Sequence, residues 1–407
     1  MRTVPPVLSL AAASLAGLAC PSLAQPSAYS ILDLGSLAGN TGSAAAFALN
    51  DDAFITGWST APATTTLAAS RRAFLYNPLA AGPLAMRDPL IGVPGSAEGT
   101  AINNANLVAG TIWQASQGGP RGFIVGGPTA VASQVRYIDP LFGGNATTAA
   151  DMNDSGQVVG SSNLATTSLA SRPTHAILWQ NGQTLDLGTL GGRNSQATAI
   201  SEAGVIVGVS DLPTLGLTAP PTRRGFIHPG PGYSMIALSA LTNSGSSRAN
   251  DVSDTAIIVG ASDWISLTAT PLSSPPIRAV LWTPATTSIV NLGTLRNTDR
   301  SSEALAVNDA GQVVGWSGTP SNAIAPSTGP TGPTAGSATR AFIWEEGTMY
   351  DLNLLIPASS GWILHVASDI NEQGQIVGWG TRLTATAAAP RQVRAFLLTP
   401  MPTDADR

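Results

Sequence analysis

The sequence predicts an all-β fold, a seven-bladed β-propeller of four-stranded antiparallel blades. One strand-rich phrase recurs seven times, and its first and last copies, at Asn50 and Asn371, lie six repeats apart, a mean period of about 53 residues. A period near 50 with several strand signals per unit is typical of propeller blades. Charged residues make up only 11% of the chain, while it contains 43 glycines and 30 prolines, which suits short strands joined by many turns.

The first two strands of each unit, A and B, are joined by a tight polar turn. Small residues such as Ala44 to Ala46 fit strand A, the innermost and most crowded strand. Turns such as Asn153-Asp154-Ser155-Gly156 consist of residues that accept turn geometry and positive φ at little cost. Strand B is β-branched and ends in glycine. The seven turn-plus-strand segments are residues 49–57, 102–110, 152–160, 200–208, 252–260, 307–315 and 370–378.

The other two strands, C and D, form a second hairpin. Strand C opens with Arg-Ala-Phe or a variant of it, and strand D is seen best as Leu185-Asp186-Leu187-Gly188. In that unit C and D are separated by Asn181-Gly182, the strongest short signal for a β-hairpin. The seven C segments begin at Arg72, Arg121, His175, Arg224, Arg278, Arg340 and Arg394.

The two ends of the chain predict how the ring closes. The last unit stops after its C strand, Arg394 to Leu398, with no D strand behind it. A D-like segment, Tyr29 to Gly35, instead precedes the first A strand. Pairing these segments would complete the seventh blade from both ends of the chain, and would remove the unpaired strand edges of an open ring.

The first 24 residues predict an export signal. Arg2 precedes an apolar stretch from Val7 to Cys20, and small residues follow at Ser22 and Ala24. We therefore expect a signal peptide at 1–24, the propeller at 25–400 and a C-terminal tail at 401–407, in a secreted or periplasmic protein. Cys20 is the only cysteine, so the mature chain would contain no disulfide. No later stretch is long and apolar enough for a membrane span.

These repeats resemble those of the HAF family of bacterial extracellular repeat proteins. The name refers to a His-Ala-Phe motif. In this chain the motif is kept loosely at His175-Ala176-Ile177, and in most other copies Arg replaces the His, giving Arg-Ala-Phe. The fullest copy runs from His175 to Gly192, and the resemblance covers nearly all of the mature chain. It implies an extracellular, propeller-like repeat protein, and it implies no established activity.

The strand order predicts that the B–C and D–A connections share one face of the ring. All the long insertions are of these two kinds: residues 60–70, 161–174, 211–223, 261–277, 318–339 and 294–302. Variable loops on a rigid scaffold are where binding usually occurs. The alternative is that these Pro/Thr/Ala-rich segments are surface padding without a function.

Recurring charges and aromatic residues in the repeat favour structural roles. An Asp in strand D recurs as Asp33, Asp88, Asp139, Asp186 and Asp351, within reach of the Arg or His that opens strand C, so we expect blade-stabilising pairs. Six tryptophans occupy repeated slots and are expected to pack between blades. Three break the pattern and are candidate binding residues, or else fold back onto their own blades: Trp113, Trp264 and Trp362.

The residue types exclude several functions. The net charge is −5, there is no lysine, and the 19 arginines are spread out, which argues against nucleic-acid binding. The three histidines lie in different units without metal-ligand spacing, and the turns supply too few carboxylates for calcium, so we expect neither metal nor cofactor.

One loop contains several charged residues: Arg296, Asp299, Arg300 and Glu303. Closeness in sequence does not make them the convergent acid pair of a glycosidase. No catalytic residue is assigned.

Three functional hypotheses remain open. The preferred one is a binding or scaffolding propeller that contacts a glycan or an extracellular protein through its long-loop face, with Arg296 and Arg300 as further candidate binding residues. The second is an extracellular hydrolase or lyase with its site at the central opening, which convergent carboxylates would favour and a funnel lined by Ala, Ser and Asn would oppose. The third is a purely structural envelope protein.

Overall fold

The protein is described here from a computed structural model of the 407-residue chain. The described residues are 28–39, 42–62, 70–80, 85–114, 118–126, 134–165, 172–213, 221–264, 276–283, 288–318, 339–382 and 392–402. The predicted signal peptide and most of the predicted C-terminal tail lie outside these residues. In the described part of the chain, no helix is long and apolar enough to cross a membrane.

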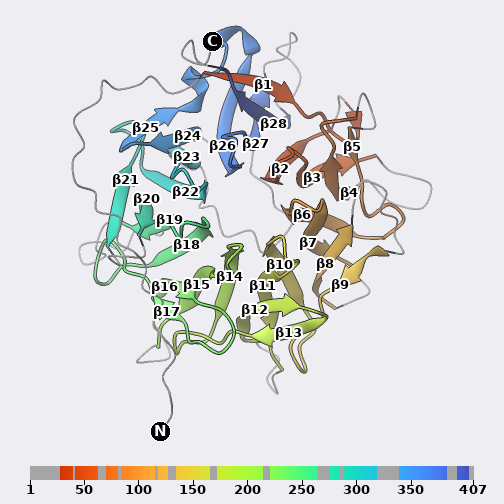
Figure 1. Cartoon of the computed structure of the whole chain (residues 1–407), viewed down its shortest axis with the longest axis vertical. Coiled ribbons are helices and arrows are strands. Elements are labelled where there is room, and N and C mark those ends of the chain that lie inside the picture. Colours follow the sequence, from red (N-terminus) through yellow and green to blue (C-terminus); the bar gives the residue numbers. More distant parts are fainter. Residues whose placement is uncertain are drawn as a thin grey trace.

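Seven four-stranded antiparallel sheets surround a central axis, as the sequence predicts (Figure 1). Blade 1 contains β2 (Ala44–Leu49), β3 (Ile55–Ala61), β4 (Ser70–Tyr76) and β5 (Met86–Arg87). Blade 2 contains β6 (Ser96–Ile102), β7 (Leu107–Trp113), β8 (Pro120–Gly126) and β9 (Arg136–Tyr137). Blade 3 contains β10 (Thr147–Met152), β11 (Val158–Asn163), β12 (Thr174–Gln180) and β13 (Gln183–Asp186). Blade 4 contains β14 (Ser195–Ile200), β15 (Ile206–Asp211), β16 (Arg223–His228) and β17 (Ile236–Ala237).

The remaining blades complete the circle. Blade 5 contains β18 (Ser247–Val252), β19 (Ile258–Asp263), β20 (Ile277–Trp282) and β21 (Ile289–Gly293). Blade 6 contains β22 (Ser301–Val307), β23 (Val313–Gly318), β24 (Arg340–Glu345) and β25 (Thr348–Asp351). Two short 3₁₀ helices, η5 (Leu352–Leu354) and η6 (Ala358–Ser360), lead to blade 7. Blade 7 contains β26 (Trp362–Ile370), β27 (Ile376–Arg382), β28 (Val393–Pro400) and β1 (Tyr29–Asp33).

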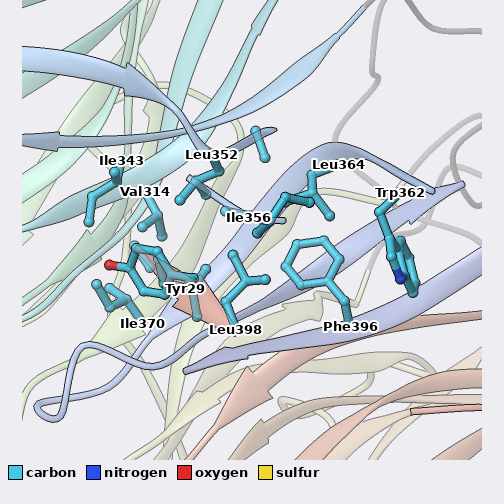
Figure 2. Packing of buried hydrophobic residues seen from close by; sticks show 14 residues of the cluster. Tyr29, Val314, Ile343, Leu352, Ile356, Trp362, Leu364, Ile370, Phe396 and Leu398 are labelled. Atoms are coloured by element: carbon cyan, nitrogen blue, oxygen red, sulfur yellow. The ribbon is translucent and has the colours of Figure 1, made fainter. Parts of the chain in front are cut away.

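The N-terminal strand closes the ring, which confirms the predicted closure. β1 lies antiparallel to β28, with Ile31 opposite Leu398 and Asp33 opposite Phe396. Tyr29 is buried where blades 6 and 7 meet: Figure 2 shows its ring among Val314, Ile370 and Leu398. The closure is therefore held by side-chain packing as well as by the strand pairing.

The glycine that ends each B segment is explained by its close approach to strand A. A Cβ built on Gly260 would lie 2.0 Å from the carbonyl oxygen of Arg248, so any larger residue would force the two strands apart. Glycines 57, 110, 160, 208, 315 and 378 have the same contact, at 2.0 or 2.1 Å. In five blades a fully buried phenylalanine of strand C lies opposite this glycine. This Gly–Phe pair is the packing unit that the repeat encodes.

In five blades the A–B turn begins with an Asn whose side chain bonds to the next blade; blades 4 and 5 have Ser201 and Ser253 there. The side-chain amide of Asn50 donates to the backbone carbonyl of Asn103, and Asn103 in turn donates to the carbonyl of Asn153. Asn371 of blade 7 donates to the carbonyl of Asn50, so the chain of bonds continues across the closure. The side-chain oxygen of Asn50 also accepts the N–H of Phe54 within its own turn. The recurring Asn therefore joins neighbouring blades in addition to making a turn.

Candidate functional site

The arginines are unevenly distributed between the two faces of the ring. The turn face is the face formed by the A–B and C–D turns. None of its seven A–B turns contains an arginine. These turns are residues 50–54, 103–106, 153–157, 201–205, 253–257, 308–312 and 371–375. The loop face, defined by the B–C and D–A connections, carries arginines at the start of nearly every C strand. Of its long insertions, residues 63–69, 166–171, 214–220, 265–275 and 319–338 lie outside the described residues.

An acidic ring surrounds the axis on the turn face. The second residue of the A–B turn is acidic in six blades and Asn in the other: Asp51, Asn104, Asp154, Glu202, Asp254, Asp309 and Glu372. Most of these side chains accept a backbone N–H from the turn of the preceding blade. The N–H of Asp154 donates to Glu202 Oε1 at 2.9 Å, and the N–H of Glu202 donates to Asp254 Oδ1 at 2.7 Å. These carboxylates thus have a structural task, joining neighbouring turns.

Three further carboxylates converge below this ring, on the innermost strands of alternate blades. Asp151, Asp251 and Asp369 occupy the position that Ala48, Ala101, Ala199 and Ala306 hold in the other four blades. One oxygen of Asp251 accepts the N–H of Val252, and the other accepts the N–H of Val307 in the next blade, at 2.9 Å. Asp151 bonds to Ile200 and Asp369 to Leu49 in the same way.

These three carboxylates are close enough to influence one another. Burial, followed by the charge of Asp151, raises the pKa of Asp251 to about 7. Burial, followed by the charge of Asp251, raises the pKa of Asp369 well above its ordinary value, and burial also raises the pKa of Asp151. All three are half-buried and not fully enclosed, as expected of side chains that line the axial opening. They form the axial triad.

Two glutamates of the innermost strands form pairs with arginines. Arg248 Nε donates to Glu303 Oε1 at 2.7 Å, and the amide of Asn250 donates to the same oxygen. Burial alone would raise the pKa of Glu303, but Arg248 and the hydrogen bonds to the carboxylate hold it below its usual value. Arg71 pairs with Glu98 at 3.3 Å. Each of these glutamates is matched by an arginine, so they do not form a convergent acid pair of the glycosidase type.

The predicted C–D charge pairs are present in five blades. They join Arg72 to Asp88, Arg121 to Asp139, His175 to Asp186, Arg340 to Asp351 and Arg394 to Asp33. As expected, Asp186 lies opposite Ile177 in the register. The six tryptophans in repeated slots also pack against neighbouring blades, as predicted.

Blade 5 departs from this pattern at a place where two candidate residues meet. Asn291 stands where blades 1, 3, 6 and 7 have Asp, and blade 4, with Ala237 at this position, lacks the pair as well. Arg278 makes no ion pair with a carboxylate in the described part of the chain. Its guanidinium carbon lies 5.3 Å from the ring centre of Trp264. Its Nη1 donates to the carbonyl of Arg300 at 2.8 Å. Trp264 is 44% exposed, so an aromatic surface and cationic groups meet on the loop face.

The other predicted binding residues lie apart from this group or play structural roles. Trp113 ends β7 in blade 2 and is half-buried. Trp362 is buried in the core of blade 7, where its ring meets Phe396 edge-on at 6.0 Å (Figure 2). Arg296 is exposed but paired with Asp299 at 2.8 Å. The structure therefore brings together Trp264 and Arg300, with Arg278 between them.

Two features were not predicted from the sequence: the role of Arg278 and the axial triad. Aligning the seven repeats could have revealed both, because Asn291 and the three axial aspartates differ from the other residues in their columns. Within the described ranges, no three His, Cys, Asp or Glu residues are grouped so as to hold a metal ion.

Comparisons with known proteins support the fold. No protein-family model matches the chain, and no curated protein matches it in sequence. Among solved structures, oligogalacturonate lyase from Vibrio parahaemolyticus is 10% identical over 93% of this chain and 94% of its own, with a TM-score of 0.53. The β-propeller domain of the Trilobed protease from Pyrococcus furiosus is 9% identical over 76% and 95%, with a TM-score of 0.37. At 10% identity the likeness to the lyase shows the propeller fold and nothing of activity.

Proposed function

We propose that the protein is an exported binding propeller that contacts a glycan or an extracellular protein through its loop face. The observation that carries this proposal is that exposed Trp264 lies beside Arg278, an arginine whose strand D position holds Asn291 and not Asp. A repeat that served only to build the ring would have no need to expose a tryptophan there. The resemblance to HAF repeats supports an extracellular setting.

An array of glycans and extracellular proteins, probed with the mature chain, tests this function. We expect a ligand whose binding is weakened at least tenfold by Trp264→Ala, because loss of a central aromatic anchor costs on the order of 2 kcal/mol. Tyr233→Ala is the matched control, since Tyr233 is also exposed but follows strand C on the turn face. A silent array, or equal losses in the two variants, would contradict the proposal and favour a structural envelope protein.

Export can be tested separately. N-terminal sequencing of the protein recovered outside the cytoplasm should start near Gln25, as the signal at residues 1–24 predicts. Recovery of the chain inside the cytoplasm with its first residues intact would refute export.

A second candidate function, acid–base catalysis at the axis, is favoured by the axial triad alone. A buried carboxyl group with a pKa near 7 is suited to proton transfer at neutral pH. Its test is an assay for cleavage of extracellular polysaccharides, with Asp251→Ala as the variant. Cleavage by the native chain that is lost in this variant would support catalysis. Absence of cleavage would contradict catalysis at the axis.

A further inference from the structure

We propose that Trp264, Arg278 and Arg300 form a subsite for an anionic saccharide, one that bears a carboxylate or sulfate group. This inference rests on the proposed binding function and names the class of ligand. It is carried by three observations about the junction of blades 5 and 6.

The first observation is the free charge of Arg278. In blade 3, Asp186 accepts the N–H of Gly188 and also pairs with His175. In blade 5, Asn291 still accepts the N–H of Gly293, at 2.9 Å, so it keeps the turn but brings no charge. The guanidinium therefore lacks the carboxylate that pairs with its counterparts in blades 1, 2, 3, 6 and 7, and an anion from solution can take that place.

The second observation is the aromatic surface. Arg278 lies over one face of Trp264, which leaves the rest of the exposed indole available to a ligand. The flat C–H face of a pyranose can stack on such a ring. A charged substituent on the same sugar would project from its edge, within reach of a neighbouring arginine. An acidic peptide has no comparable flat apolar face, so the combination favours a saccharide.

The third observation is a second arginine at the same junction. Arg278 donates to the backbone carbonyl of Arg300, which is exposed on the loop face. Asp299 balances Arg296. In a chain of net charge −5 whose opposite face carries the acidic ring, this junction is a place on the loop face that attracts an anion.

The test compares polymers that differ in charge. Dextran sulfate and polygalacturonate supply the sulfate and carboxylate arms, neutral dextran supplies the uncharged arm, and poly-L-glutamate supplies acidic peptide. Titration of the full mature chain should show binding of at least one anionic polysaccharide, weakened by added salt. Dextran and poly-L-glutamate should bind at least tenfold more weakly.

The decisive variant is Asn291→Asp, which introduces the aspartate that blades 3, 6 and 7 have at this position. It should pair with Arg278, leave the fold intact, and weaken binding of the anionic polysaccharide about tenfold, the loss expected for one charge-assisted hydrogen bond. Arg278→Gln should have a similar effect, and Asp351→Asn, the reverse change in blade 6, should have none.

The outcomes separate the two proposals. The anionic subsite would be overturned if Asn291→Asp left the binding of a ligand found on the array unchanged. It would also be overturned if neutral dextran bound as tightly as dextran sulfate. Neither result would contradict the binding function. Equal binding of poly-L-glutamate would also overturn the anionic subsite, by showing that charge alone is recognised. A chain that binds nothing in either experiment would overturn both.

Discussion

At the scale of single residues, the C–D charge pair contributes differently to the free energy of unfolding in different blades, because its surroundings differ. Arg72 is buried, and besides Asp88 it donates to the carbonyls of Leu90, Val93 and Gly95. In blade 2, the partner of Arg121 is Asp139, whose side chain is 81% exposed. Water competes for the second pair and hardly reaches the first.

We therefore predict that Arg72→Leu lowers the free energy of unfolding by about 3 kcal/mol, because it leaves a carboxylate and three carbonyls without their donor. Arg121→Leu should cost less than about 1 kcal/mol. Urea denaturation of both variants measures the difference. Similar costs would show that enclosure does not set the strength of these pairs.

At the scale of secondary-structure elements, the pairing of β1 with β28 can be tested by a cross-link. Ser30 is exposed and lies opposite Thr399 in the register. In a Cys20→Ser background, Ser30→Cys with Thr399→Cys should form a disulfide on oxidation and raise the free energy of unfolding by about 2–4 kcal/mol, since it ties together two distant parts of the chain.

The out-of-register pair, Ser30→Cys with Leu397→Cys, is the control for this cross-link. Its second residue lies opposite Leu32. A free-thiol assay under oxidising and reducing conditions distinguishes the two pairs. If the control oxidised as readily as the matched pair, the register described here would be wrong.

Elements were more predictable than the sites they carry. The blade count, strand order and closure follow from the repeat, because turn chemistry and strand alternation are local properties of the chain. The axial triad escaped prediction because each A strand has a bulge. Ala249 pairs with Gly260 and Asp251 pairs with Val259, so simple alternation misplaces every residue after position 250. Trp362, expected beside a loop, instead begins the nine-residue strand β26 and is buried.

At the scale of the whole molecule, the axial triad predicts how stability depends on pH. The pKa of Asp251 is about 7 in the folded state, and those of Asp151 and Asp369 are also raised, whereas an Asp in the unfolded chain titrates near about 4. Between these values the folded state binds more protons than the unfolded chain. Its stability is therefore highest at the acidic end of this range and falls as pH rises through about 7.

We expect the free energy of unfolding to decrease by on the order of 2–4 kcal/mol from pH 5.5 to pH 8. Replacing all three aspartates by alanine, the residue that the other four blades use, should remove most of this slope. The raised pKa values of Glu202 and Glu372 would leave a smaller slope of the same sign. Denaturant melts across this range provide the measurement, and stability that rises towards pH 8 would refute the prediction.

Because blade 7 combines the two ends of the chain, the order of synthesis matters. β1 is among the earliest segments to be made, yet its partner, residues 393–400, is among the latest. Until residues 393–400 are made, β1 has no strand to pair with and the ring is not closed. A chain that stops a few residues early would thus leave two loose edges far apart in sequence. Quality-control proteases that recognise unpaired strands would find both edges on the same chain. Incomplete chains would therefore be degraded more readily than complete ones.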